Sequence, residues 1–115
     1  NFRKFIQNAM LPMVLTDENQ NIVFVNRQFT SSFGYNKNHF PTVDDWWEKL
    51  YSNSDYRELL RHNWTKYSID AFERNIPIPN REVMVTCLDG TQKLAIASSS
   101  VGANYILVIF IEDES

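Results

Sequence analysis

Residues 82–100 read EVMVTCLDGTQKLAIASSS, and this stretch decides the fold class because it predicts a β-hairpin. Two β-prone runs flank Asp89-Gly90, which predicts a two-residue type I′ turn, since glycine accepts the positive φ that this turn requires. A hairpin alone is barely stable in water, so more strands must join it. The apolar runs at 13–16, 22–25 and 105–111 are the segments that can supply them.

Short helices are predicted on either side of the first two strands. In residues 1–10 the apolar side chains recur every three or four positions, as they do on one face of a helix. Asn26 is predicted to open a second helix that Gly34 ends. The polar turn at 17–21 joins the two strands, and Asn21 is its expected left-handed residue.

Two further helices are predicted before the hairpin. Asp44 and Asp45 are expected to cap the first of them with negative charge. The second starts at Asp55 and is expected to end before Pro77. Its apolar face is predicted to consist of Tyr56, Leu59, Leu60, Trp64, Tyr67 and Ala71.

This order of elements predicts an α+β fold, in which a five-stranded antiparallel sheet carries helices on one face and a short N-terminal helix precedes it. The last strand is apolar on both sides, so both faces of the sheet are expected to be covered. The N-terminal helix or a second copy of the chain would cover the face that the other helices leave open.

Composition narrows the class of protein. The length of 115 residues and the 43% hydrophobic content suit one domain with one core. The net charge of −3 gives no positively charged surface to bind nucleic acid. The single cysteine, Cys87, fits a reducing compartment. No apolar run is long enough to cross a bilayer, so we expect no direct membrane contact. Because the chain starts without Met, we expect it to be a fragment of a larger protein.

Two motifs carry a family resemblance. Residues 11–35, LPMVLTDENQNIVFVNRQFTSSFGY, and residues 85–92, VTCLDGTQ, resemble in order and spacing a PAS domain. PAS domains are sensor modules of histidine kinases in two-component systems, of diguanylate cyclases and of related signalling proteins. The resemblance implies a flanking helix at 1–10, a PAS domain at 11–115, a cytoplasmic location, a homodimer and an output domain in the same chain.

No residue indicates a haem, flavin or metal site, and the cofactor stays unknown. Some PAS domains bind haem through a histidine on the long helix, but His62 lies roughly 140° from the centre of the apolar face, which predicts that it faces solvent. His39 has no second ligand at metal spacing and is expected at the surface. The light-sensing PAS subgroup carries a reactive cysteine on a helix, whereas Cys87 is predicted to be a small buried hydrophobe on a strand.

A set of aromatic and polar side chains could line a ligand pocket between the sheet and the helices. The set consists of Asn26, Phe29, Phe33, Tyr35, Trp47, Trp64, Tyr67, Arg81 and Ser98. For each aromatic residue, a place in the core is the simpler interpretation. Arg81 could hold a ligand carboxylate in a bidentate fork, although an exposed charge at the rim is the interpretation that we favour.

The sequence leaves three functions open. The first is a sensory PAS domain that binds a small organic ligand and relays its presence to an output domain. The second is a ligand-free dimerisation module whose own aromatic residues fill the core. A small enzyme on the same scaffold is the third, but no catalytic motif supports it, so we expect no catalysis from this domain.

Overall fold

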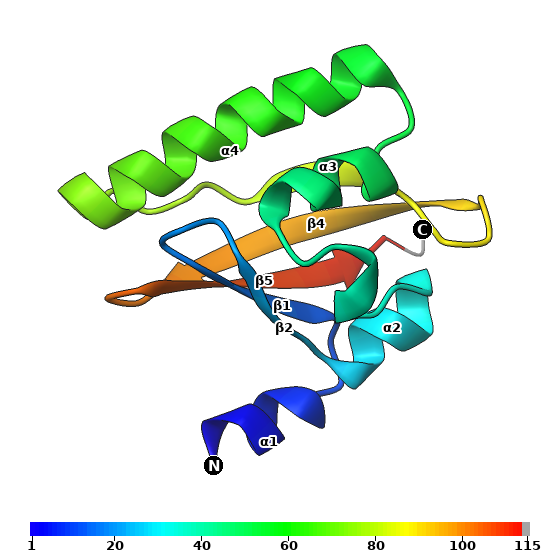
Figure 1. Cartoon of the computed structure of the whole chain (residues 1–115), viewed down its shortest axis with the longest axis horizontal. Helices are drawn as coiled ribbons and strands as arrows, with labels where there is room; N and C mark the ends of the chain where they lie inside the picture. The colour runs from blue at the N-terminus through cyan, green and yellow to red at the C-terminus, as the bar shows by residue number, and fades with distance from the viewer. Residues whose placement is uncertain (114–115) are drawn as a thin grey trace.

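The computed structural model describes residues 1–113 (Figure 1). In chain order the elements are α1 (Phe2–Gln7), β1 (Met13–Asp17), β2 (Ile22–Val25), α2 (Arg27–Phe33), the 3₁₀ helix η1 (Lys37–His39), α3 (Val43–Leu50), α4 (Ser54–Arg74), β3 (Arg81–Thr86), β4 (Gln92–Val101) and β5 (Tyr105–Glu112). The strands form one sheet in the order β2-β1-β5-β4-β3, and every neighbouring pair is antiparallel. The predicted α+β fold with five antiparallel strands is therefore confirmed.

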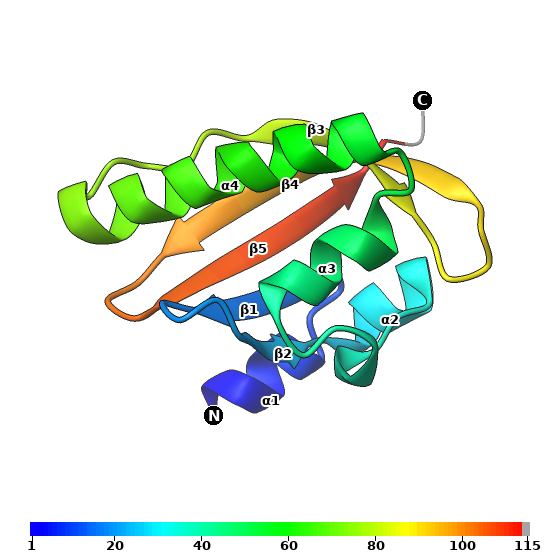
Figure 2. The same ribbon diagram turned by 45° about the horizontal axis from the view of Figure 1, so that its top comes forward.

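The sheet carries α3 and α4 on one face. Figure 2 shows both helices over the strands, with α4 running along the β3 and β4 side and α3 nearer β1 and β2. α1 lies beyond β2, on the side of the molecule away from α4. The central strand, β5, comes from the C-terminal end of the chain and pairs with β1 on one side and β4 on the other, so it ties the N-terminal half to the hairpin.

The β3–β4 hairpin is present, but its predicted two-residue turn is wrong. The last paired residues are Thr86 and Gln92, which leaves a five-residue loop between them. The Gly90 N–H donates to the Cys87 carbonyl at 2.9 Å, and within this loop Gly90 has the positive φ, at 89°. A type I′ turn needs two such residues, whereas Asp89 uses its carboxylate to accept the Thr91 N–H at 3.0 Å and stays right-handed.

The turn between β1 and β2 also differs from its prediction. The left-handed residue is Gln20, with a φ of 64°, and not Asn21. Asn21 is held by Asp17, whose carboxylate accepts both the backbone and the side-chain N–H of Asn21 at 2.9 and 3.1 Å. The Gln20 side chain accepts the indole N–H of Trp64 at 3.1 Å, so this turn is tied to α4.

The boundaries of α3 and α4 differ from the predicted ones, whereas those of α2 agree. α3 starts two residues early because Thr42 is its N-cap, and Asp45 completes a capping box with it. α4 starts after Asn53 and ends at Arg74, where Asn75 takes a left-handed φ of 55° before Pro77 is reached. α2 begins after Asn26 and ends at Gly34 as predicted.

The core lies between α2, α3 and the inner face of the sheet. Phe29 packs against Phe33 with ring centroids 4.9 Å apart and against Phe110 of β5 at 5.6 Å. Trp46 of α3 stacks on Phe110 at 5.7 Å. On the predicted apolar face of α4, Leu59 is an exception, because it is 56% exposed.

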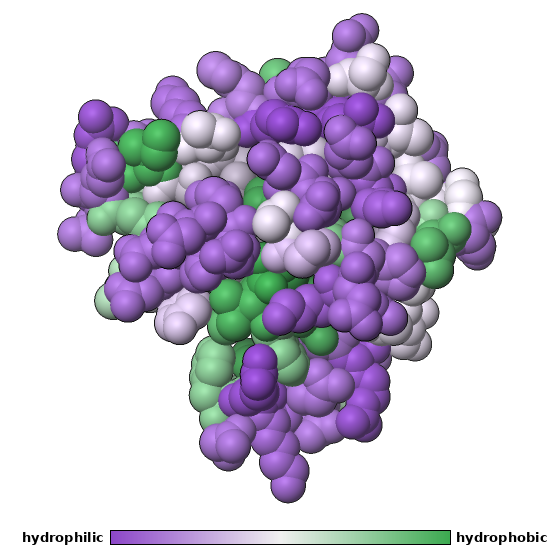
Figure 3. All heavy atoms as spheres, viewed as in Figure 1, coloured by the Kyte–Doolittle hydropathy of each residue, from purple (hydrophilic) through white to green (hydrophobic). Residues whose placement is uncertain are grey.

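The predicted coverage of both sheet faces is not complete within the chain. Ile96 and Ile111 point from the outer face and are exposed, whereas their neighbours Ala97 and Phe110 on the inner face are buried. α1 packs through Ile6, while Phe2 and Phe5 are 62% and 73% exposed. Figure 3 shows hydrophobic residues gathered next to α1 on the viewed face.

Candidate functional site

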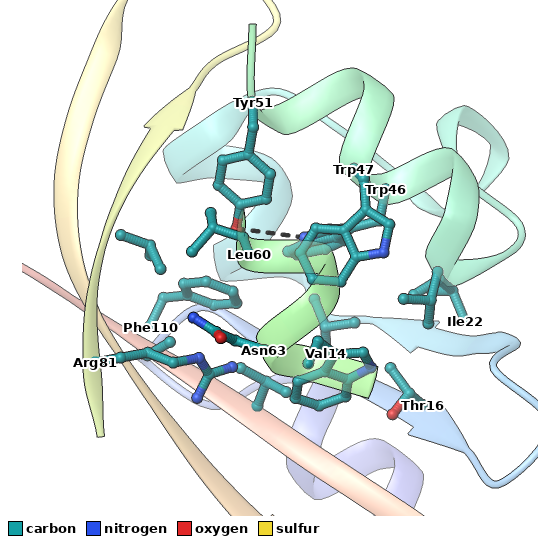
Figure 4. Close-up of a pocket in the computed structure, with 15 residues that line it drawn as sticks. Val14, Thr16, Ile22, Trp46, Trp47, Tyr51, Leu60, Asn63, Arg81 and Phe110 are labelled. Carbon is teal, nitrogen blue, oxygen red and sulfur yellow. Dashed lines mark hydrogen bonds between the residues drawn. The ribbon is translucent and has the colours of Figure 1, made fainter. Parts of the chain in front are cut away.

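A cavity of about 40 Å³ lies between the inner face of the sheet and helices α3 and α4. Its walls are mostly apolar, and they come from β1, β2, α3, α4 and the three C-terminal strands (Figure 4). Three polar side chains from three different elements also reach it: Thr16, Asn63 and Arg81. Small-molecule sites in proteins typically combine apolar walls with a few placed polar groups.

Strand register decides that Arg81 faces this cavity. Arg81 pairs with Ala97, and Ala97 pairs with Phe110, so the three side chains lie on the same face of the sheet. Ala97 and Phe110 are buried beneath the helices. The Arg81 side chain therefore lies beneath α4 and is half-buried, which contradicts our interpretation of an exposed charge at the rim.

Two aromatic rings of α4 hold the Arg81 side chain. Its guanidinium carbon lies 5.4 Å from the centroid of a Trp64 ring and 5.9 Å from the centroid of Tyr67, within range of cation–π attraction. Its Nη1 donates only long hydrogen bonds, to the Pro79 carbonyl at 3.4 Å and to Ser99 Oγ at 3.5 Å. Burial lowers the pKa of Arg81, and the neighbouring Tyr51 and Tyr67 oppose this effect.

Tyr51 forms another part of the cavity wall. Its hydroxyl accepts the Trp46 indole N–H at 3.4 Å, and its ring stacks on Trp47 at a centroid distance of 5.7 Å. Burial raises the pKa of Tyr51 from 10.0 to about 12, against the smaller lowering effects of the Trp46 hydrogen bond and of Arg81. Tyr51 is thus a neutral hydroxyl at physiological pH, able to donate a hydrogen bond.

The structure brings three of the nine predicted site residues to this cavity. Trp47, Trp64 and Arg81 line it, and Tyr67 lies next to them against the Arg81 guanidinium. Phe29 and Phe33 belong to the adjoining ring cluster of the core.

Three other predicted site residues are engaged by the chain itself or lie on the other face of the sheet. The Tyr35 hydroxyl donates to the carbonyl of Thr86 at 2.6 Å, outside the cavity. The Asn26 side chain is fully buried and makes four hydrogen bonds, all to backbone atoms. Ser98 pairs with Ile109 on the outer face of the sheet, because it alternates with the inward-facing Ala97.

Sequence reasoning missed Thr16, Tyr51 and Asn63. Asn63 was detectable, because it follows Leu60 by three positions and precedes Tyr67 by four, which places it on the same face of α4. Thr16 was hidden because its strand carries apolar residues on both faces, and Tyr51 because it follows α3 as the first residue outside the helix.

The residues weighed for cofactor chemistry lie away from the cavity. His62 is exposed, as predicted from the helical wheel. Cys87 is buried, as predicted, but it lies in the loop after β3 and not on a strand. His39 is half-buried rather than at the open surface, because its Nδ1 accepts the Asn36 N–H at 3.0 Å. Among residues 1–113, no three His, Cys, Asp or Glu side chains are grouped closely enough to hold a metal ion.

Comparison with known proteins gives a family and a set of structural neighbours. A family model described as PAS domain matches residues 1–77 of the chain. No curated protein sequence shows a significant match. Over the described residues, no helix has the length and apolar character that a membrane span requires.

Solved structures with the same fold cover nearly all of the chain. One is a domain of a sensory box sensor histidine kinase/response regulator from Geobacter sulfurreducens, with 19% identity and a TM-score of 0.68, covering 96% of this chain and 90% of that one. A PAS domain of an HTR-like protein from Haloarcula marismortui has 16% identity and a TM-score of 0.63, covering 97% and 88%. The PAS domain of a LuxR-family transcriptional regulator from Burkholderia thailandensis, in complex with ethanol, has 13% identity and a TM-score of 0.68, covering 100% and 99%.

Proposed function

Because this chain belongs to the PAS domain family, we propose that it is the sensory domain of a signal-transduction protein and that it binds a small organic molecule in the cavity beneath α3 and α4. The observation that carries this proposal is the cavity itself, in which aromatic walls surround Arg81 and Asn63. A similar fold from Burkholderia thailandensis was solved with a small organic molecule, ethanol, which supports the class of ligand.

The relay to an output domain would run through β5. Phe110 and Val108 line the cavity, and both belong to the strand that leads to the C-terminal end of the chain. A ligand that repositions Phe110 would favour one position of β5 over another, which is a population shift of a two-state element. We infer an output domain in the same chain, such as a histidine kinase of a two-component system or a diguanylate cyclase, and a cytoplasmic location.

Native mass spectrometry of the purified domain, together with its absorption spectrum, tests the proposal. We expect a bound mass of a small organic molecule that leaves on denaturation and brings no visible absorption band. A bound mass with a visible band would contradict a colourless ligand and would point to haem or flavin. A bare protein whose melting temperature and amide resonances are unchanged by a library of small metabolites would contradict ligand sensing altogether.

A ligand-free dimerisation module is the second candidate, because apolar side chains remain uncovered. Phe2 and Phe5 of α1 are largely exposed, and Ile96 and Ile111 are exposed on the outer face of the sheet. Burying apolar surface of this kind is favourable by roughly 25 cal/mol per Å². A second copy of the same chain would cover it through an interface that uses the same patch twice.

Analytical ultracentrifugation of the wild type and of Phe5→Ser tests the second candidate. A dimer whose dissociation constant is at least tenfold higher in Phe5→Ser than in the wild type supports the second candidate. Leu59→Ser is a matched control, because Leu59 is also exposed but lies on α4. A monomer at millimolar concentration, or an equal effect of both substitutions, would contradict a dimer built on α1.

A further inference from the structure

We propose that the ligand of the cavity is a small organic carboxylate, whose head group is held by the guanidinium of Arg81 together with the Asn63 amide and the Tyr51 hydroxyl. This inference rests on the proposed function, because it names the chemical class of the ligand for the same site.

The charge of Arg81 has no acidic partner within residues 1–113. The four ion pairs of this part of the chain join Arg61 to Asp44 and to Glu58, Arg74 to Asp70, and Lys93 to Glu112. The ionisable groups that face Arg81 are Tyr51 and Tyr67, and neither is a carboxyl group. Cations that proteins remove from water are normally paired with an anion, so this guanidinium is incomplete without one.

The hydrogen-bonding capacity of Arg81 is also largely unused. Nη1 makes the two long bonds to Pro79 and Ser99, and Nε and Nη2 make none within the described residues. Trp64 and Tyr67 fix the orientation of the side chain, so its planar fork is held ready before a ligand arrives. A carboxylate is the anion whose two oxygens match this fork.

Two neighbouring side chains offer further donors. Asn63 lines the cavity, and its amide makes no hydrogen bond within residues 1–113. The Tyr51 oxygen accepts from Trp46, so its own hydrogen is available to an acceptor in the cavity. Figure 4 shows the Tyr51 ring and the Arg81 side chain directed into the same space from different elements. The polar part of the cavity therefore presents donors and positive charge, and no carboxylate of residues 1–113 lines it.

The size of the cavity limits the ligand. Its volume of about 40 Å³ is well below the roughly 150 Å³ of an engineered cavity that holds benzene. The apolar walls, including Val83 and Val108, suit a group no larger than a methyl behind the head group. Formate and acetate are therefore the first probes, and formamide and acetamide are neutral partners of nearly the same shape.

Titration of the ¹⁵N-labelled domain with these four compounds at constant ionic strength tests the inference. We expect both carboxylates to shift the backbone amide signals of Thr16, Val83 and Ala97, and to bind at least tenfold more tightly than the amides. Arg81→Gln is expected to weaken carboxylate binding at least tenfold and to leave the weak binding of the amides unchanged. Arg27→Gln, which removes an exposed arginine outside the cavity, is the matched control.

Two further measurements keep the test decisive. Arg81→Lys retains the charge without the planar fork and is expected to bind with intermediate affinity, even if Arg81→Gln fails to fold. Inorganic phosphate is expected not to compete.

Amides that bind as tightly as carboxylates, with no effect of Arg81→Gln, would overturn the carboxylate and leave a neutral ligand for the proposed function. Phosphate that competes equally would overturn the carboxylate in favour of a phosphorylated ligand, and no binding by any compound class, including the metabolite library, would overturn both proposals.

Discussion

Replacing Asn26 with Ala should remove the connection between α1, β1 and α2. The Asn26 Oδ1 atom accepts the N–H groups of Met13 and Phe29, each at 2.9 Å. Its Nδ2 donates to the carbonyls of Ile6 at 3.0 Å and Leu11 at 2.8 Å. One side chain with no exposed surface thus joins the end of α1, the segment before β1 and the first turn of α2.

The expected loss of stability in Asn26→Ala depends on whether water can reach the backbone groups that Asn26 leaves behind. The bonds to Phe29 and Ile6 are buried, and a buried group left without its partner costs about 1–3 kcal/mol. The bonds to Met13 and Leu11 are partly buried, so water can replace them and each contributes about 0.5–1 kcal/mol. We therefore expect Asn26→Ala to lower the free energy of unfolding by about 3–8 kcal/mol, out of a total that is about 5–15 kcal/mol for domains of this kind.

Urea denaturation of Asn26→Ala, Asn26→Asp and Asn36→Ala measures this effect. Asn36 is the matched control, because it also caps a helix, η1, but lies exposed and accepts one N–H from Asn38. Its loss should cost about 0.5–1 kcal/mol. Asn26→Asp keeps the two accepted bonds but places a buried carboxyl oxygen against the carbonyls of Ile6 and Leu11, so it should cost at least as much as Asn26→Ala and should speed amide exchange in α1 more than in β1.

Equal losses in Asn26→Ala and Asn36→Ala, within about 0.5 kcal/mol, would refute this reasoning. Such a result would mean that Asn26 acts only as a helix cap and that α1 is held by the packing of Ile6. Unchanged exchange in α1 of Asn26→Asp would refute the role of the donated bonds alone.

Two other predictions concern the glycine stops and the buried phenol. Gly34→Ala should lower the free energy of unfolding by about 2–4 kcal/mol and Gly90→Ala by about 1 kcal/mol. Both glycines have a positive φ, but only at Gly34 would the new Cβ clash with a neighbour, at 2.8 Å from Leu88 Cβ. Equal losses of stability in thermal denaturation would contradict the clash. Because the folded-state pKa of Tyr51 is raised to about 12, its contribution to stability is present below pH 10 and is lost as the pH rises through 12. Wild type should therefore lose up to about 2–3 kcal/mol more than Tyr51→Phe between pH 9 and 12 in urea denaturation, and parallel pH profiles would contradict it.

The order and type of the elements were predictable because their signals are local. The stop at Gly34 and the opening of α2 by Asn26 each act over a few neighbouring residues. Where the prediction failed, another local group competed. The Asp17 carboxylate accepts a hydrogen bond from Asn21, and the left-handed residue of this turn is Gln20 instead. Thr42 is the N-cap of α3 in place of Asp44.

The candidate site was predictable only in part, since its residues come from distant segments. Trp64 and Trp47 were recognisable as large apolar groups on helices. Phe29 and Phe33 have the same character in the sequence and belong to the same buried core, but they do not line the cavity. No pattern along the chain separates an aromatic ring that borders a cavity from one that fills the core.

The sequence by itself determined the family, the five strands, the helices between them and the exposure of His62. Only the tertiary structure decided that Arg81 faces inward without an acidic partner, that Tyr51 and Asn63 join it, and that Asn26 serves the backbone and not the cavity. The physical reason is the distance along the chain between the residues that interact. Turns, caps and helical periodicity depend on neighbours a few residues apart, whereas the surroundings of Arg81 depend on the register of β3, β4 and β5 and on the position of α4 above them.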